Sequence, residues 1–145
     1  MIEVELDDEA WGAVPDVEDL VHQAAMAALD QPGLITVTLT DDDTVADLNQ
    51  RFRGKAGPTN VLSFPAAETA RPFLGDVILA FGVCAREAGE QAKPLEDHLR
   101  HLVVHGVLHL LGYDHLDDAE AETMEARERT LLAKLGVPDP YAVTR

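Results

Sequence analysis

Four short stretches of alternating or mostly apolar residues along the chain predict four β-strands. Successive side chains of a strand point to opposite faces of a sheet, so alternation indicates one buried face and one wet face. The first stretch alternates apolar with acidic residues, and the others are rich in β-branched or apolar residues. Pro65, directly after the third stretch, places that strand at a sheet edge. The predicted strands cover residues 2–6, 34–39, 61–64 and 74–81.

Five further stretches carry the signals of α-helices. Residues 15–29 begin with a proline and acidic side chains in the first turn, and a Pro-Gly pair follows them. Three aspartates, Asp41 to Asp43, supply N-cap chemistry for a short helix that ends near Arg51. The order βαβαββααα lacks strict alternation, so it predicts an α+β fold with one mixed sheet of about four strands and about five helices. The remaining predicted helices cover residues 83–91, 94–112 and 117–135.

The size and composition indicate one domain. A chain of 145 residues, 46% of them apolar, has material for one core, and we expect residues 1–145 to form a single domain. No stretch reaches the roughly 18–20 apolar residues of a membrane span, and the acidic N-terminus is unlike a secretory signal. Cys84 is the single cysteine, and we expect it to be a small buried side chain instead of a nucleophile. These features predict a cytoplasmic protein without a membrane partner.

The net charge of −16 argues against a nucleic-acid partner, but this charge is unevenly distributed. Residues 1–50 carry thirteen acidic and no basic residues, whereas residues 51–100 carry seven Lys or Arg against six acids. Because phosphates are bound by Lys and Arg, an anionic substrate is expected only near the middle third. Arg51, Arg53 and Lys55 form the obvious cluster there. On charge alone, a solvated loop is the simpler interpretation of this cluster.

Three histidines near the end of the predicted helix 94–112 have the spacing of a metal site. His105 and His109 are four residues apart, so their imidazoles lie on one helical face. Gly112 permits a left-handed turn that ends the helix and returns the chain, which brings His115 to the same point. Three neutral imidazoles leave the fourth tetrahedral position of zinc open for water, as in catalytic sites. The sequence therefore predicts one zinc ion per chain on these three histidines.

Two other histidines lie on the same predicted helix. His98 and His101 fall within about a quarter turn of His105, so the pair His101/His105 has the spacing to chelate as well. Only the pair His105/His109 connects to the following turn and His115. We therefore expect His98 and His101 to be surface groups or neighbours that touch the ligands.

The spacing of the three ligands equals that of the long zincin motif, H-E-x-x-H-x-x-G-x-x-H, with one departure. Gly106 stands where zincin proteases carry the glutamate that acts as general base. The metal scaffold is therefore intact, but the proton acceptor of the peptidase reaction is missing.

Three segments carry a longer pattern. Residues 105–115 read HGVLHLLGYDH, residues 48–65 read LNQRFRGKAGPTNVLSFP, and residues 74–77 read LGDV. The first segment matches H-G-x-L-H-L-x-G-Y-D-H at every defined position. The second is similar to L-N-x-x-[FY]-R followed by P-T-[ND]-V-L-S-F-P, and the third is similar to a central strand. In these motifs, and in length and element order, the chain resembles the YbeY family of bacterial rRNA maturation factors, which are metal-dependent endoribonucleases.

The resemblance implies a site and a substrate. It implies zinc on His105, His109 and His115, with Arg53 facing the metal cleft as the catalytic residue. The implied activity is cleavage of single-stranded RNA, linked to processing of the 16S rRNA 3′ end and to ribosome quality control. The expected partners are an rRNA precursor and the small ribosomal subunit or its assembly factors, with no DNA expected. The planar guanidinium of Arg53 suits a catalytic role in RNA cleavage because it binds two phosphate oxygens at once.

Two carboxylates are candidates for orienting the zinc ligands. Asp76 interrupts an apolar strand, and a buried carboxylate needs partners. It either accepts a hydrogen bond from the far nitrogen of a ligand histidine or bonds to backbone. Asp114 either takes the same orienting role or caps the turn before His115. Ser63 lies on the short strand that borders the expected cleft, without a sequence signal for substrate contact.

Two other functions stay open on the sequence alone. A zinc peptidase is supported by the ligand spacing and opposed by Gly106. A ribosome-assembly binding protein would use the metal as a structural element, with cleavage incidental. A nuclease would cleave RNA and a peptidase would cleave casein, so the two assays distinguish these functions. An open water position on the metal would distinguish both enzymes from the binding protein.

Overall fold

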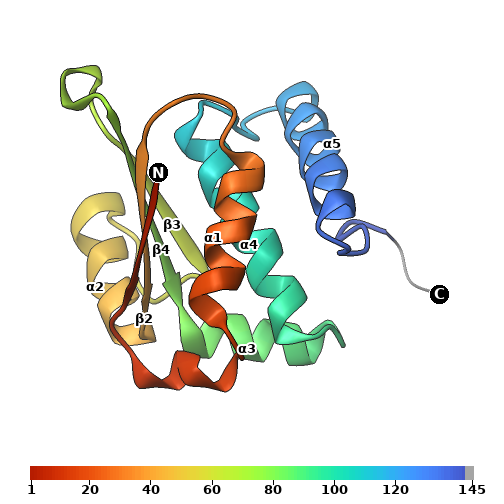
Figure 1. The fold of residues 1–145 in the computed structure, drawn as a ribbon. Helices are drawn as coiled ribbons and strands as arrows, with labels where there is room; N and C mark the ends of the chain where they lie inside the picture. The colour runs from red at the N-terminus through yellow and green to blue at the C-terminus, as the bar shows by residue number, and fades with distance from the viewer. Residues whose placement is uncertain (143–145) are drawn as a thin grey trace.

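The computed structural model describes residues 1–142, and within them a four-stranded sheet has helices on both faces (Figure 1). These described residues form five α-helices and two short 3-10 helices, the latter at Glu9–Ala13 and Glu68–Ala70. The α+β prediction with one mixed sheet is confirmed. The strands are β1 (Ile2–Leu6), β2 (Leu34–Thr40), β3 (Val61–Pro65) and β4 (Phe73–Ala80). The α-helices are α1 (Val17–Ala28), α2 (Asp42–Arg53), α3 (Phe81–Glu90), α4 (Leu95–Leu110) and α5 (Asp118–Lys134).

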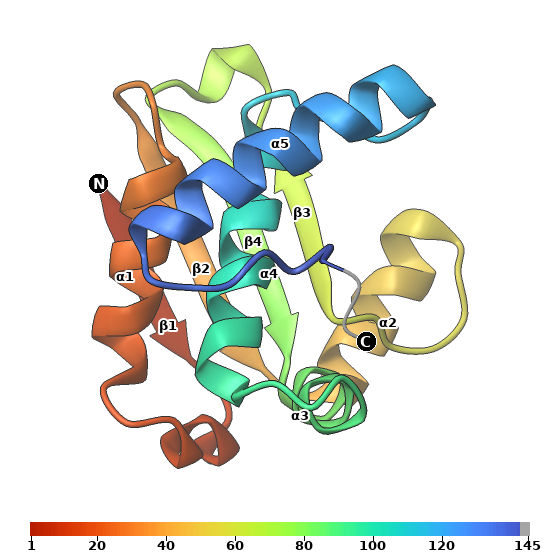
Figure 2. The ribbon, with the colours of Figure 1, turned by 90° about the vertical axis from the view of Figure 1, so that its right-hand side faces the viewer.

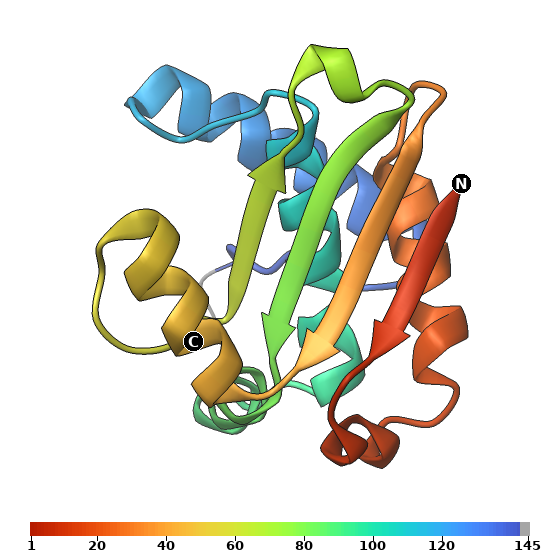
Figure 3. The same ribbon diagram turned by 90° about the vertical axis from the view of Figure 1, so that its left-hand side faces the viewer.

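The sheet has the strand order β1-β2-β4-β3, which Figure 3 shows from one face. The pairs β1/β2 and β2/β4 are parallel, because each is joined through a connection that contains a helix. Strand β3 pairs antiparallel with β4 and lies at the sheet edge, as Pro65 predicts. This edge is where the sheet meets the end of α4, so β3 borders the histidines.

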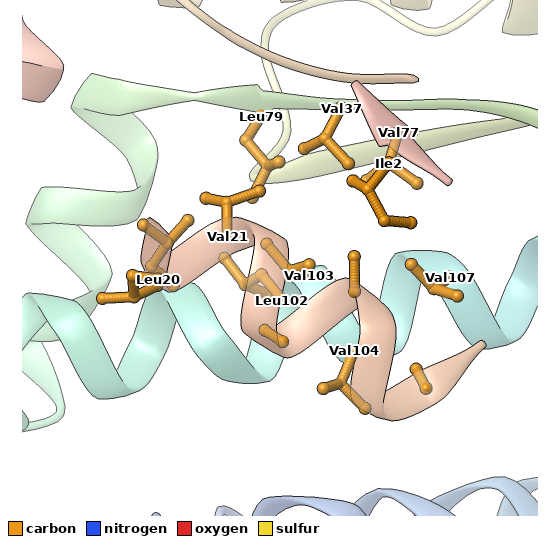
Figure 4. Packing of buried hydrophobic residues seen from close by; sticks show 14 of the residues in the cluster. Ile2, Leu20, Val21, Val37, Val77, Leu79, Leu102, Val103, Val104 and Val107 are labelled. Carbon is orange, nitrogen blue, oxygen red and sulfur yellow. The ribbon is translucent and has the colours of Figure 1, made fainter. Parts of the chain in front are cut away.

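The helices form layers on the two faces of the sheet (Figures 1 and 2). Helices α1 and α4 cover one face, α2 covers part of the other, and α5 lies outside α4. The main core fills the space between the sheet and the α1/α4 layer. There Val37, Val77 and Leu79 of the strands face Val21 of α1 and Val103 of α4 (Figure 4). Helix α4 is therefore held along most of its length, which fixes the position of its last turn.

The observed helix bounds differ from the predicted ones by one or two residues at most helix ends. Helix α2 runs to Arg53 instead of Arg51, because Gly54 with φ of 65° supplies the left-handed residue that ends it. Helix α3 begins at Phe81, directly after β4, and not at Val83. The Val83 N–H in the first turn donates to the Asp42 carboxylate at 3.1 Å, and Asp42 lies 41 residues away in the chain.

Two residues of the core carry a polar or reactive group. Cys84 is fully buried, and burial raises the pKa of its thiol to about 12, so the structural interpretation is confirmed. Trp11 is also fully buried, and its indole N–H donates to the carbonyl of Thr40. Among the described residues, no helix is long and apolar enough to cross a membrane.

Candidate metal centre

The three predicted ligand histidines lie together at the C-terminal end of α4. His105 and His109 occupy successive turns, and their Nε2 atoms are 3.1 Å apart. Gly112 adopts φ of 103°, and the Tyr113 N–H donates to the Leu108 carbonyl, so the chain turns back here. This turn brings the His115 ring to 5.1 Å from the His109 ring, centroid to centroid. The turn predicted from Gly112 therefore forms, and it joins all three side chains.

The donor atoms of this cluster fit a zinc ion. One nitrogen from each of His105, His109 and His115 lies within 4.8 Å of the others. Two nitrogens bound at 2.0–2.1 Å to a tetrahedral zinc are about 3.3 Å apart, close to the spacing of the first pair. Burial and the neighbouring rings of His105 and His115 lower the pKa of His109. This favours the neutral imidazole that metal binding requires.

A cleft of about 600 Å³ opens in front of the three histidines. The end of α2, the loop after it and strand β3 form the opposite wall, which carries Arg53 and Lys55. Of the described residues that line the cleft, Asp114 alone is acidic. One wall of the cleft therefore carries two cationic side chains and the other carries the three histidines. The chain as a whole has a net charge of −16. The lining residues are Arg53, Lys55, Thr59, Asn60, Val61, Leu62, Ser63, Pro65, His105, His109, Gly112, Tyr113, Asp114, His115 and Leu116.

The Arg53 side chain is held at the cleft by β3. Its Nη2 donates to the Ser63 carbonyl at 2.7 Å, and its guanidinium carbon lies 5.6 Å from the centre of the Phe64 ring. A guanidinium has five N–H donors, so one anchoring bond leaves the others for a ligand. The residue is exposed, and the sequence-based expectation that it faces the cleft agrees with its place in the cleft wall.

Gly106 is a contact point between α4 and the sheet. A Cβ at this position would lie 2.6 Å from Cγ1 of Val77 and 3.3 Å from Oγ of Ser63. The Ser63 hydroxyl donates to the Gly106 carbonyl at 3.0 Å, which ties β3 to α4. A side chain at 106 would therefore run into the sheet. In this fold the position has no room for the zincin glutamate.

Replacement of Gly106 by alanine is expected to lower the free energy of unfolding by about 1–3 kcal/mol, the usual cost of overpacking. The new methyl group would have to displace the side chain of Val77, which is fixed in the core. Chemical denaturation measures the change. Gly12→Ala is the matched control, because nothing lies within 4 Å of a Cβ there, and it should stay within about 0.5 kcal/mol of wild type. Equal stability of the two variants would contradict this packing role.

The two candidate orienting carboxylates have different places. Asp114 accepts a hydrogen bond from the His115 N–H at 2.8 Å, so it fixes the turn that carries the third ligand. Asp76 lies on β4 next to Val77, and alternation puts it on the sheet face away from α4. Of the two roles that the sequence allowed Asp76, its position does not fit the orientation of a ligand histidine, and its side chain makes no hydrogen bond to a histidine or to backbone among residues 1–142. Burial, followed by the charge of Glu5, raises the pKa of Asp76.

A different carboxylate, Glu128 of α5, contacts the ligand helix. Its Oε1 lies 2.5 Å from Nδ1 of His105, and its side chain is completely buried. Sequence analysis did not select this residue. A signal was present, because Glu128 stands four residues after Met124 and three before Leu131, on the apolar stripe of the helix. The sequence does not indicate, however, which helix this apolar stripe packs against.

The two remaining histidines of α4 have separate partners. His98 is buried and its Nε2 lies 2.9 Å from Glu87 of α3, so it is neither a surface group nor a neighbour of the ligands. The expectation for His98 was therefore wrong. His101 lies one turn before His105, and its Nε2 is 3.1 Å from the second oxygen of Glu128. It is thus linked to the metal cluster through that carboxylate.

Comparison with known proteins identifies the family to which this chain belongs. The family model described as Endoribonuclease YbeY matches residues 5–136. The endoribonuclease YbeY of Maricaulis maris is 50% identical over 145 residues, covering 97% of this chain and 91% of that protein. That of Paramagnetospirillum magneticum is 52% identical over 155 residues, covering 97% and 94%. The solution structure of TM1509 from Thermotoga maritima has the same fold, with a TM-score of 0.58 and 24% identity over 99% of this chain and 100% of that chain. The match spans the cleft wall with Arg53 as well as the turn with His115, and the chain belongs to the YbeY family.

Proposed function

We propose that this protein is a zinc-dependent endoribonuclease that cleaves single-stranded RNA. The observation that carries the proposal is the meeting of three imidazoles with Arg53 in one cleft. Relatives at about half identity over 97% of the chain are named endoribonucleases, which supports the same reaction class here. We further propose that residues 1–145 act as one domain in the cytoplasm, in maturation of the 16S rRNA 3′ end and in ribosome quality control. Its partners there are an rRNA precursor and the small ribosomal subunit or its assembly factors.

In phosphodiester hydrolysis, the two walls of the cleft would have different roles. Zinc on His105, His109 and His115 would supply a Lewis acid and a bound water whose pKa is lowered to about 7. The free N–H groups of Arg53 are suited to two oxygens of the scissile phosphate, and its anchor on the Ser63 carbonyl limits its motion. Such donors lower the barrier when their bonds tighten as negative charge develops.

The charge distribution supports an RNA strand that enters along β3. Arg53 and Lys55 lie on that wall of the cleft, whereas residues 1–50 carry no basic residue. Phosphate contacts by cations supply most of the affinity for a nucleic-acid backbone. The acidic remainder of the chain repels the strand and thus confines it to this path.

A chelator test distinguishes this function from its alternatives. We expect the zinc-loaded protein to cleave a single-stranded RNA, to lose this activity with a chelator and to regain it with added zinc. Casein should stay intact, because Gly106 cannot act as a base. Robust zinc-dependent cleavage of casein would favour a peptidase. A zinc-loaded protein that binds RNA without cutting it would favour an assembly factor with a structural metal.

A further inference from the structure

We propose that Glu128 is a positioning residue of the metal centre, which holds His105 through its Nδ1 atom so that Nε2 points at the metal position. The inference rests on the zinc site of the proposed function and assigns a task to a residue outside the ligand set. Glu128 belongs to α5, and the ligands belong to α4 and the turn that follows it. The carboxylate therefore acts from a separate helix, 23 residues beyond His105 in the chain.

The buried carboxylate of Glu128 requires hydrogen-bond partners. Its side chain is completely excluded from solvent, and it stands among Met124, Leu131 and Leu132, which are buried on the same helix. A carboxylate in such a place is costly unless charged hydrogen bonds satisfy it. A side chain that only filled space here would be apolar, so the role of this carboxylate lies in its hydrogen bonds.

Three donors surround the two oxygens of this carboxylate. Nδ1 of His105 lies 2.5 Å from Oε1, and Nε2 of His101 lies 3.1 Å from Oε2. The Tyr141 hydroxyl donates to Oε2 as well. A carboxylate oxygen accepts hydrogen bonds, so the buried side chain of Glu128 is satisfied when each of these three neighbours is the donor.

The donor role of His105 decides its tautomer. If Nδ1 carries the proton, a neutral ring has its lone pair on Nε2. That atom lies 3.1 Å from Nε2 of His109, on the side of the cleft. A carboxylate behind a ligand imidazole also raises the basicity of the ligand. Glu128 therefore favours metal binding through both orientation and charge.

The C-terminal segment closes over this carboxylate. Tyr141 is fixed by its N–H, which donates to Asp139 at 2.8 Å, and Asp139 pairs with Arg129 of α5 at 3.2 Å. The Arg129 guanidinium also lies 5.5 Å from the centre of the Tyr141 ring. These contacts hold the hydroxyl in place and keep water away from Glu128.

A second metal ion is the competing interpretation, because His101, His105 and Glu128 also place ligand atoms within 4.8 Å of one another. That ion would need Nδ1 of His105 while Nε2 of the same ring binds zinc, so the ring would have to lose both protons. Two of the contacts to Glu128 have hydrogen-bond lengths of 3.1 Å or less between heavy atoms. The hydrogen-bonded network satisfies the carboxylate without an ion.

The test compares zinc affinity in three full-length variants. Glu128→Gln keeps the size but removes the charge, and we expect zinc affinity to fall by roughly 10–100-fold, the usual effect of losing such a partner. Glu122→Gln, at an exposed position of the same helix, is the matched control and should bind zinc like wild type. Glu128→Asp keeps the charge and should fold even if Glu128→Gln does not, with an intermediate affinity. Competition with a chromogenic chelator measures affinity and stoichiometry.

A second measurement separates positioning from mere support of the fold. In the zinc-loaded wild type, ¹H–¹⁵N spectra of the histidine rings should show a protected Nδ1–H proton of His105, shifted downfield by its charged acceptor. That signal should move upfield or vanish in Glu128→Gln while thermal unfolding stays cooperative.

Each outcome is decisive. Wild-type zinc affinity and an unchanged Nδ1–H signal in Glu128→Gln would overturn this inference alone. Two zinc ions per chain, reduced to one in His101→Ala, would make Glu128 a ligand and overturn it as well. A wild-type protein that binds no zinc would remove the proposed metal function together with the inference.

Discussion

Replacement of His109 by alanine is expected to remove most of the bound zinc and, with it, RNA cleavage. His109 is the middle member of the cluster, 3.1 Å from His105 between Nε2 atoms and 5.1 Å from His115 between ring centres. Without it two ligands remain, and one of them is on an exposed turn. The loss should exceed the roughly 10–100-fold that follows removal of a ligand's hydrogen-bonding partner. Metal analysis after dialysis and an RNA cleavage assay measure the two effects.

Two other histidines provide the controls. His22 is exposed on α1, and His22→Ala should leave both zinc content and stability unchanged. His98 is buried against Glu87, so His98→Ala should keep the zinc but lower the free energy of unfolding. Equal zinc loss in His98→Ala and His109→Ala would show that the wrong histidines had been chosen.

The second large effect is expected from Arg53→Ala, which should sharply reduce RNA cleavage while zinc content and folding stay unchanged. The side chain is exposed and bonds to protein through one N–H on the Ser63 carbonyl, which borders the cleft, so water can take the place of that donor. Removal of a single donor to a transition-state oxyanion costs about 10²–10³-fold in turnover in well-studied hydrolases. Single-turnover cleavage of a short RNA separates this loss from weaker binding.

A neighbour on the same helix is the matched control for Arg53. Arg51 is exposed, pairs with Asp47 at 3.2 Å and is absent from the cleft wall, so Arg51→Ala should cleave RNA at nearly the wild-type rate. Arg53→Lys should recover only part of the activity, because an ammonium group cannot make the two-pronged contact. Wild-type cleavage by Arg53→Ala would remove this residue from the active site and leave the metal to act without it.

Local chemistry in the sequence determined most of the secondary structure and the grouping of the three histidines. Alternation and short apolar stretches located the four strands, and Pro65 marked the strand that lies at the edge. The spacing of His105 and His109 and the turn at Gly112 depend only on backbone geometry within a few residues. For this reason both features could be predicted from the sequence without knowledge of the fold. The family motif around Arg53 likewise placed that residue at the cleft.

Tertiary structure alone decided which distant groups serve these local features. Asp76 and Glu128 are both carboxylates at otherwise apolar positions, and the sequence does not say which one faces α4. Strand alternation turns Asp76 to the far sheet face, whereas the packing of α5 on α4 aims Glu128 at His105. Gly106 is set by the same kind of contact, the close approach of α4 to Val77. Such contacts join residues from separate elements, and their identity follows from how the elements pack, which no short stretch of sequence contains.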